Sequence, residues 1–446
     1  MSLKEQEPII IVGAGWAGLS AALTLSRQGK KIILLEAAPQ AGGRARRVFF
    51  GEDRVDNGQH LLLGAYRHIL TTLEWLKIPE KTCLHRVPLE LWIADLHQQN
   101  RSFHLKNVKF CSPLQQLASL FHLKGLTWKE RFKMAHFFHA IQNNLFELDA
   151  KTDISIEKFL YSFNQPKSLI KKLWAPIAIA ALTTPIHEAS AQVFLQVLKD
   201  TFCKNKENSD LLFPKKDLSE LLPDPILQHL KNHNNFIFYN QRIKGLIVEN
   251  GECKGVYTAA EQFKGQSVIL ATPPQVSAQL IQQSPATTLC KTLIDQLLKF
   301  QYQPITTVYL RYPKAIELNF PMIGFINSTI HWIFDRSLTG HPNILSVVIS
   351  AEDPHTQLAH PQLVEKITKE LASHFLAFKQ TPIDYRVIRE KRAAFSCHVG
   401  VNAYRPENIT PLTNLWLAGD YTQTYYPATL EGAVQSGMQT AQLILS

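Results

Sequence analysis

The feature that most constrains this chain is a set of three glycines near its start. An apolar run at residues 9–12 leads directly into Gly13, Gly15 and Gly18, and a helical pattern follows. In this setting the first glycine permits a tight turn, the second lets the backbone approach a pyrophosphate, and the third lets the helix pack on the strand. The helix N-terminus then presents free N–H groups to the phosphates. The sequence therefore predicts a Rossmann-like unit that binds a dinucleotide.

The residues after this turn complete the same unit. Apolar and small side chains recur at helical spacing through residues 19–26, and Gly29 suits the end of that helix. Residues 32–35 are continuously apolar, as expected of a buried parallel strand, and Glu36 follows them. An acid at this strand end is placed to accept hydrogen bonds from a ribose. We therefore expect Glu36 to bind the dinucleotide together with the glycines.

The chain is long enough for two domains, with 446 residues of which 45% are hydrophobic. We predict an α/β fold, α+β overall, in which a discontinuous dinucleotide-binding domain accommodates an inserted domain. The dinucleotide-binding domain takes residues 1–85, 210–285 and 395–446. The inserted domain binds substrate, faces the membrane and consists of helices and an antiparallel sheet, and it takes residues 86–209 and 286–394.

Several classes of protein are excluded by what the sequence lacks. Its six cysteines include no C-x-x-C pair, which indicates reduced thiols in a cytoplasmic protein. The pair His187-Glu188 lacks the second histidine of an H-E-x-x-H motif, because Ala191 stands at that position, and we expect no metal site. No signal peptide is visible, and no apolar run is long enough to span a membrane.

The net charge of +10 calls for an explanation. The basic residues are scattered and no nucleic-acid-binding motif is present, so we expect no nucleic acid partner. Two interpretations stay open: peripheral contact with an anionic membrane, at its inner face, or a basic but merely soluble protein. The pattern of Met134, Phe137, Phe138 and Ile141 allows two interpretations as well, a helix on a membrane interface or a helix facing a core.

Motifs at both ends of the chain resemble those of the flavin amine oxidase and phytoene desaturase superfamily. The N-terminal motif comprises the glycine turn, Glu36 and residues 42–44, and the C-terminal motif comprises residues 417–420, 430–433 and 436–437. Within that group, residues 37–46, 56–60, 332–336 and 426–433 are similar to the hydroxysqualene dehydroxylase family. The likeness runs from about residue 8 to the end of the chain.

The resemblance implies FAD as the dinucleotide. It implies that Glu36 holds the adenosine ribose, that Arg44 lies beside the phosphates or the ribityl chain, and that Gly419 and Asp420 contact the pyrophosphate and the ribityl chain. The segment from Thr429 to Ala433 would open the last helix beneath the isoalloxazine, where a helix N-terminus stabilises the anion of a reduced flavin. The predicted FAD-binding residues are Gly13, Gly15, Gly18, Glu36, Gly43, Arg44, Gly58, Gly419, Asp420, Leu430, Glu431, Gly432 and Ala433.

The family reaction would be the reductive removal of the hydroxyl of hydroxysqualene to give squalene, with hydride from the flavin. Hydroxide is a poor leaving group, so an acid must assist its departure. Three residues are candidates for this catalytic role: Asp335, Tyr425 and Tyr426. Asp335 has the alternative role of an ion-pair partner, for Arg336 or another neighbour, and the two tyrosines have that of cavity lining.

An apolar polyisoprenoid substrate would need a long hydrophobic cavity. The apolar segment 174–182 and the Phe-rich residues 121–146 are candidates for its lining. Three rival functions remain, of which an amine oxidase is less favoured by the basic surface. A phytoene-type carotenoid desaturase shares the flavin motifs and moves hydride in the opposite direction, and a prenyl-binding escort protein on the same fold would have no catalytic activity and no flavin. The oligomeric state is not indicated by the sequence.

Overall fold

A computed structural model gives the structure of the chain, and it describes residues 7–95, 102–106, 123–143, 145, 148, 151–316, 318, 320–351 and 357–446. One half of the molecule is built on a five-stranded parallel sheet, whose strands come from distant parts of the chain. In spatial order the strands are β11 (Phe236–Phe238), β2 (Ile32–Leu35), β1 (Ile9–Val12), β15 (Ser267–Leu270) and β21 (Leu415–Leu417). Buried apolar side chains occupy almost every position of the three central strands, as a sheet covered on both faces requires.

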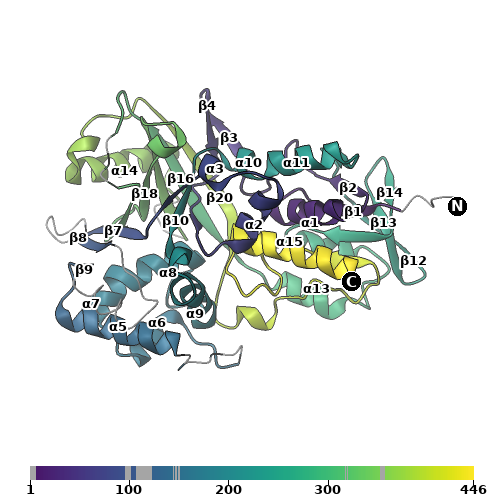
Figure 1. Cartoon of the computed structure of the whole chain (residues 1–446), viewed down its shortest axis with the longest axis horizontal. Coiled ribbons are helices and arrows are strands. Elements are labelled where there is room, and N and C mark those ends of the chain that lie inside the picture. The colour runs from purple at the N-terminus through teal and green to yellow at the C-terminus, as the bar shows by residue number, and fades with distance from the viewer. Residues whose placement is uncertain are drawn as a thin grey trace.

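Two helices from opposite ends of the chain lie side by side against this sheet (Figure 1). They are α1 (Trp16–Arg27), which follows the glycine turn, and the C-terminal α15 (Leu430–Leu445). Small residues allow the close approach: a Cβ on Gly437 would lie 2.1 Å from the backbone oxygen of Ala17 and 2.2 Å from Ser20 Oγ. The Ser20 hydroxyl also donates to the backbone oxygen of Val434 at 3.1 Å. The two chain ends are therefore joined directly through backbone contacts.

Shorter elements surround the parallel sheet. The antiparallel strands β12 (Gly245–Glu249), β13 (Glu252–Tyr257) and β14 (Gln262–Lys264) form a small sheet that contacts β15, and Asn250-Gly251 makes the turn between the first two with positive φ. The helices of this region are α2 (Arg67–Trp75), α3 (Glu80–Cys83), α10 (Leu218–Leu221), α11 (Pro223–Asn232), α12 (Pro274–Gln282) and α13 (Lys291–Leu298). The remaining strands are β3 (Arg47–Phe50), β4 (Asp53–Asp56), β5 (Leu62–Leu63), β6 (Leu84–Val87) and β10 (Leu211–Pro214).

A second, eight-stranded sheet stands at the other end of the molecule (Figure 1). Its strands in spatial order are β20 (Asp384–Phe395), β16 (Tyr302–Arg311), β19 (Ile344–Ser350), β18 (Trp332–Asp335), β17 (Met322–Ile326), β7 (Glu90–Asp95), β8 (Ser102–Lys106) and β9 (Leu123–Lys124). Neighbours are antiparallel except for β17 and β7, which are parallel. Helix α14 (His360–His374) packs on this sheet through Leu363, Val364, Ile367 and Leu371.

A group of helices lies below the second sheet in the same view (Figure 1). They are α5 (Trp128–Gln142), α6 (Ile156–Ser162), α7 (Lys167–Leu169), α8 (Ala175–Leu182) and α9 (Ala191–Leu198), with π-helical turns η1 (Ile170–Trp174) and η2 (Lys199–Cys203). The apolar face of α5 is buried in the core, where Phe137 and Phe138 contact Trp174. The membrane-interface interpretation of that face is therefore wrong, because its side chains already have protein partners.

The mixed fold agrees with the α/β class expected from the sequence, and the parallel βαβ unit begins at the glycine turn as expected. The domain boundaries stay a prediction. Strands from both ranges assigned to the inserted domain, β7 to β9 and β16 to β20, share one sheet. Among the described residues, no helix combines the length and the apolar character that crossing a membrane requires.

The contact between α1 and α15 predicts a steric effect. We expect Gly437→Val to destabilise the protein by about 1–3 kcal/mol, because its side chain has no room against the α1 backbone. The measurement is the apparent melting temperature of the flavin-loaded protein. Gln442→Val, on an exposed position of the same helix, is the control. Equal melting temperatures for the two variants would contradict the close packing.

Candidate active site

One large cavity, of about 1150 Å³, extends from the glycine turn to the second sheet. This volume exceeds the usual range for a single drug-sized ligand. One end is lined by backbone and polar groups from the loops of the parallel sheet, and the other by apolar side chains. The cavity therefore offers a polar cradle that continues into an apolar chamber.

The cradle is formed where two glycine-containing loops meet. Gly42 pairs with Gly15 in an isolated bridge, and its N–H donates to the backbone oxygen of Ala14 at 2.8 Å. Gly13 has φ of +106°, and a Cβ there would lie 2.4 Å from a backbone oxygen of Ala271. A Cβ on Gly15 would meet nothing within 4 Å, and no side chain caps α1. The backbone at Gly15 thus presents an open surface and a helix N-terminus, which suits a pyrophosphate.

Glu36 lies at the end of β2 and lines the cavity. Its carboxylate accepts hydrogen bonds from the N–H of Ala14 at 2.7 Å and of Ala38 at 2.8 Å. These bonds fix its orientation, and a carboxylate has further lone pairs for the hydroxyls of a ribose. The position of Glu36 therefore suits the adenosine ribose of FAD, which is the ligand expected for this residue from the sequence.

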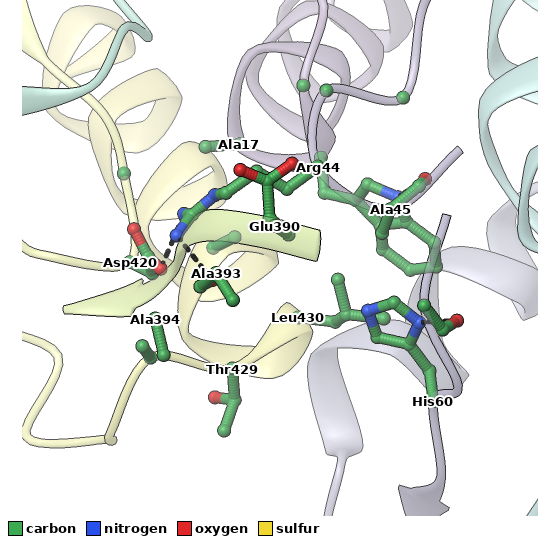
Figure 2. A pocket seen from close by; sticks show the side chains of 18 of the residues that line it. Ala17, Arg44, Ala45, His60, Glu390, Ala393, Ala394, Asp420, Thr429 and Leu430 are labelled. Atoms are coloured by element: carbon green, nitrogen blue, oxygen red, sulfur yellow. Dashed lines mark hydrogen bonds and ion pairs between the residues drawn. The ribbon is translucent and has the colours of Figure 1, made fainter. Parts of the chain in front are cut away.

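Arg44 and Asp420 join the two chain ends across the cavity (Figure 2). Arg44 Nη2 lies 2.7 Å from Asp420 Oδ2, and Nη1 donates to the backbone oxygen of Ala393 at 2.9 Å. Burial alone would lower the pKa of Arg44, but the charge of Asp420 raises it above its ordinary value. The cation is thus fixed beside the cradle, where it complements the negative charge of phosphates.

Arg405 was not indicated by the sequence, because no motif marks it. It is 1% exposed, and its guanidinium donates to backbone oxygens of Thr422, Asp420 and Tyr426 at 2.8, 2.8 and 2.6 Å. Burial lowers its pKa to about 10, so it stays protonated at neutral pH. Arg405 therefore sets the path of the loop that carries Asp420 and Tyr426 into the site.

His60 lies on the opposite side of the cavity from Arg44, next to Leu430 (Figure 2). Its Nδ1 is 2.8 Å from the backbone oxygen of Gly58. A carbonyl only accepts, so Nδ1 carries the proton and Nε2 is the acceptor. Burial, together with the charge of Arg44, lowers the pKa of His60 to about 4. The imidazole is therefore neutral at physiological pH, and its one N–H is held by the backbone oxygen of Gly58.

The start of α15 meets the expectations only in part. Thr429 caps the helix by accepting from the N–H of Gly432 at 3.1 Å, and Leu430 and Ala433 line the cavity. Glu431 does not line it. Its fully buried carboxylate accepts from the backbone N–H of His68 and Ile69, at 2.8 and 3.1 Å, and so caps α2. The cofactor-binding role expected for Glu431 is thus corrected to a structural one.

The other predicted cofactor residues divide in the same way. Gly58, Gly419 and Gly43 line the cavity, whereas Gly18 and Gly432 do not. A Cβ on Gly18 would lie 2.0 Å from the backbone oxygen of Gly13, and one on Gly432 would lie 3.3 Å from Tyr426 Cβ. Gly18 is therefore required for helix packing, as the motif implies, and Gly432 belongs to the packing beneath the site.

Of the three candidate proton donors, only Tyr426 lines the cavity. Asp335 lies on a separate pocket of about 10 Å³ and accepts from the N–H of Ser337 at 2.8 Å. Tyr425 is 56% exposed and is not among the residues that line the cavity. The catalytic expectation for Asp335 and Tyr425 is corrected on these grounds, because neither reaches the cavity.

The chamber beyond the cradle is apolar. The second sheet contributes Leu91, Met322, Trp332, Phe334 and Val348, and the helices contribute Ile177, Ala180, Ala181, Val197 and Phe202. Part of the segment 174–182 therefore lines the cavity, as the sequence suggests. In the Phe-rich stretch 121–146, Phe137 and Phe138 belong to the core instead, and residues 121, 122, 144 and 146 lie outside the described residues. Within the described ranges, no three or more Cys, His, Asp or Glu side chains cluster as metal ligands would.

The ion pair across the cradle predicts a loss of cofactor. We expect Asp420→Asn to retain markedly less flavin, because Arg44 loses its ion-pair partner and is no longer fixed in place beside the phosphates. The measurement is the ratio of flavin absorbance, near ~450 nm, to protein absorbance after desalting. Glu249→Gln serves as the control, because it removes an exposed ion pair with Lys264 that does not line the cavity. Full retention by Asp420→Asn would contradict this account.

Comparison with known proteins places this geometry in a family. The family model described as flavin containing amine oxidoreductase matches residues 16–445. The chain is 27% identical to the hydroxysqualene dehydroxylase of Rhodopseudomonas palustris over 98% of both proteins. It is 25% identical to the 15-cis-phytoene desaturase of Solanum lycopersicum over 98% of this chain and 77% of that protein.

A solved structure of an oxidoreductase from Methanosarcina mazei shares the fold, with a TM-score of 0.76 at 15% identity over 98% of this chain and 100% of that one. The family match runs from the start of α1 to the end of α15, so it includes Glu36, residues 42–44 and the C-terminal motif. The cofactor is FAD, in agreement with the fit of the cradle. The chain belongs to the flavin containing amine oxidoreductase family, and it is an FAD-dependent oxidoreductase.

Proposed function

We propose that this protein catalyses the FAD-dependent reductive removal of the hydroxyl group of hydroxysqualene, giving squalene. The observation that carries the proposal is the single cavity that joins a dinucleotide cradle to an apolar chamber. A long isoprenoid has no polar groups along most of its length, and the chamber walls offer it apolar side chains. The similarity to hydroxysqualene dehydroxylases over nearly the whole of both chains supports the same substrate class.

The chain's own residues have defined tasks in this reaction. When bound and reduced, FAD supplies the hydride. The walls around Trp332 and Phe334 exclude water from the carbon that loses its oxygen, which protects a transient allylic cation. Neutral His60 adds no positive charge next to that cation. Tyr426, the candidate donor that lines the cavity, is placed to hydrogen-bond with the departing oxygen.

A phytoene-type desaturase is the second candidate, favoured by the similarity to 15-cis-phytoene desaturases. The chain covers 77% of that desaturase but 98% of the hydroxysqualene dehydroxylase. Both reactions move hydride between the flavin and an allylic carbon, in opposite directions, so the cradle alone does not separate them. The substrate must.

The proposed reaction predicts a clear difference between two incubations. Anaerobically reduced protein given hydroxysqualene should form squalene, whereas oxidised protein given phytoene should leave it unchanged. The products are separated and identified by mass. Phytoene dehydrogenation without squalene formation would contradict the proposal in favour of a desaturase.

We also infer a peripheral contact with anionic membranes, since the substrate partitions into lipid. Two aromatic side chains at the start of α5, Trp128 and Phe132, are 51% and 59% exposed, next to Lys129 and Arg131. Exposed aromatic residues beside basic ones are typical of an interfacial contact. This surface lies at the end of the molecule opposite β2 (Figure 1).

This contact predicts that Phe132→Glu weakens binding to vesicles that contain phosphatidylglycerol. We expect a several-fold loss in co-sedimentation, because a charge replaces an inserted ring. Phe236→Glu is the matched control, because Phe236 is 61% exposed on β11, at the far edge of the parallel sheet. Equal losses for both variants, or no binding by the unmodified protein, would refute the membrane contact.

A further inference from the structure

A buried carboxylate interrupts the apolar chamber. Asp200 lies on η2, the π-helical turn that follows α9, and its side chain is 6% exposed. It lines the cavity beside Val197, Leu198 and Phe202. Burying a carboxylate costs free energy unless it is paired and hydrogen-bonded, and π-helical turns occur frequently at functional sites. Neither cofactor binding nor an isoprenoid chain accounts for a charge at this place.

The partners of Asp200 hold its carboxylate in place but leave part of its hydrogen-bond acceptor capacity free. Gln196 Nε2 donates to Oδ2 at 3.0 Å, and Lys204 Nζ lies 2.6 Å from Oδ1. The phenol of Tyr426 lies near enough to the same carboxylate for the charge of Asp200 to raise its pKa. A carboxylate offers about four acceptor positions. In the described part of the chain Gln196 takes one position on Oδ2, whereas buried Oδ1 pairs with the charge of Lys204 but accepts no hydrogen bond, so an acceptor position remains there for a ligand in the cavity.

The tyrosine side of this group is equally suited to a polar ligand. Tyr426 and Tyr66 both line the cavity. Burial, and then the charge of Asp200, raises the pKa of Tyr426 far above its ordinary value, and burial with the charge of Glu431 does the same for Tyr66. Both phenols are therefore neutral and keep their protons as hydrogen-bond donors. Asp200, Tyr426 and Tyr66 form a polar group in the lining of the cavity, and we call it the hydroxyl site.

We propose that Asp200, held by Gln196 and Lys204, recognises the hydroxyl group of the substrate by accepting its hydrogen bond. This inference rests on the proposed function and adds the residue that selects the substrate. An alcohol fills the remaining acceptor position of the carboxylate, whereas a hydrocarbon would leave it unpaired in an apolar chamber. Sites built to hydrogen-bond a hydroxyl discriminate strongly against analogues that lack it, because their polar groups then stay unsatisfied.

Binding to the oxidised, FAD-loaded protein tests the inference without turnover. The ligands are hydroxysqualene and squalene, and the readout is the change in flavin absorbance on titration. We expect Asp200→Asn to raise the Kd for the alcohol roughly 10-fold and Asp200→Leu to raise it at least as much, with the Kd for squalene nearly unchanged. Loss of the negative charge removes a charge-assisted hydrogen bond that the hydrocarbon never makes.

Glu130→Gln is the matched control. Glu130 is a comparably buried carboxylate with a lysine, Lys172, at 4.0 Å, but it does not line the cavity. Its flavin spectrum and its Kd values for both ligands should equal those of the unmodified protein. If Asp200→Asn changed both Kd values equally, or neither, the hydroxyl site would be refuted.

The same titration separates this inference from the proposed function. Squalene formation by the reduced, unmodified protein reports on the reaction alone. If that protein forms squalene but Asp200→Asn keeps the preference for the alcohol, only the hydroxyl site fails. If it forms no squalene and yet the preference for the alcohol depends on Asp200, the reaction is wrong and the recognition of a hydroxyl stands.

Discussion

The close contact between α1 and α15 is the constraint on which the rest of the structure depends. The two helices begin at the two motifs that line the cradle. Gly437 of α15 has no side chain, so its backbone packs directly against Ser20 of α1. Because the helices are fixed at this distance, the glycine turn and the loop at Asp420 face each other across the cavity. The Arg44–Asp420 pair then closes the same gap electrostatically. A cofactor site assembled from residues more than 400 positions apart follows from this packing.

The chemistry of the site follows from how polarity changes along the cavity. At the cradle, backbone N–H groups and Arg44 complement phosphates, whereas beyond it the second sheet and helix α8 supply apolar walls. Arg405 holds the loop at the junction between the two parts through backbone carbonyls of residues 420–426. A reaction that begins at a flavin and ends on an apolar chain needs such a junction, because hydride transfer requires the two partners in contact and water excluded.

Local sequence patterns could predict the parallel unit and most of the cradle. Glycine spacing and continuous apolar strands are short-range signals, and they correctly indicated β1, α1 and β2. Sequence patterns failed where a side chain has a partner that only the fold supplies. Glu431 sits inside the C-terminal flavin motif but caps α2, whose first turn is more than 300 residues earlier in the chain. The apolar face of α5 was ambiguous because periodicity shows that a face is buried without showing by what.

Asp200 and Arg405 are residues of the site that the sequence patterns did not indicate at all. A π-helical turn disturbs the 3.6-residue period, so no pattern marks Asp200 as facing inward. Arg405 has no neighbouring motif, and it acts by donating hydrogen bonds to backbone carbonyls 15 to 21 residues away. Asp335 and Tyr425 stood beside informative motifs, and proximity in sequence gave them a role that their positions in space do not permit.

The most direct test of the central claim is a crystal structure of the protein with oxidised FAD and squalene. The account predicts that the isoalloxazine lies between His60 and the N-terminus of α15, and that the hydrocarbon continues from it in the same cavity, between Trp332 and helix α8. A flavin and a hydrocarbon found in separate cavities, or side chains filling the space at the junction, would contradict the account.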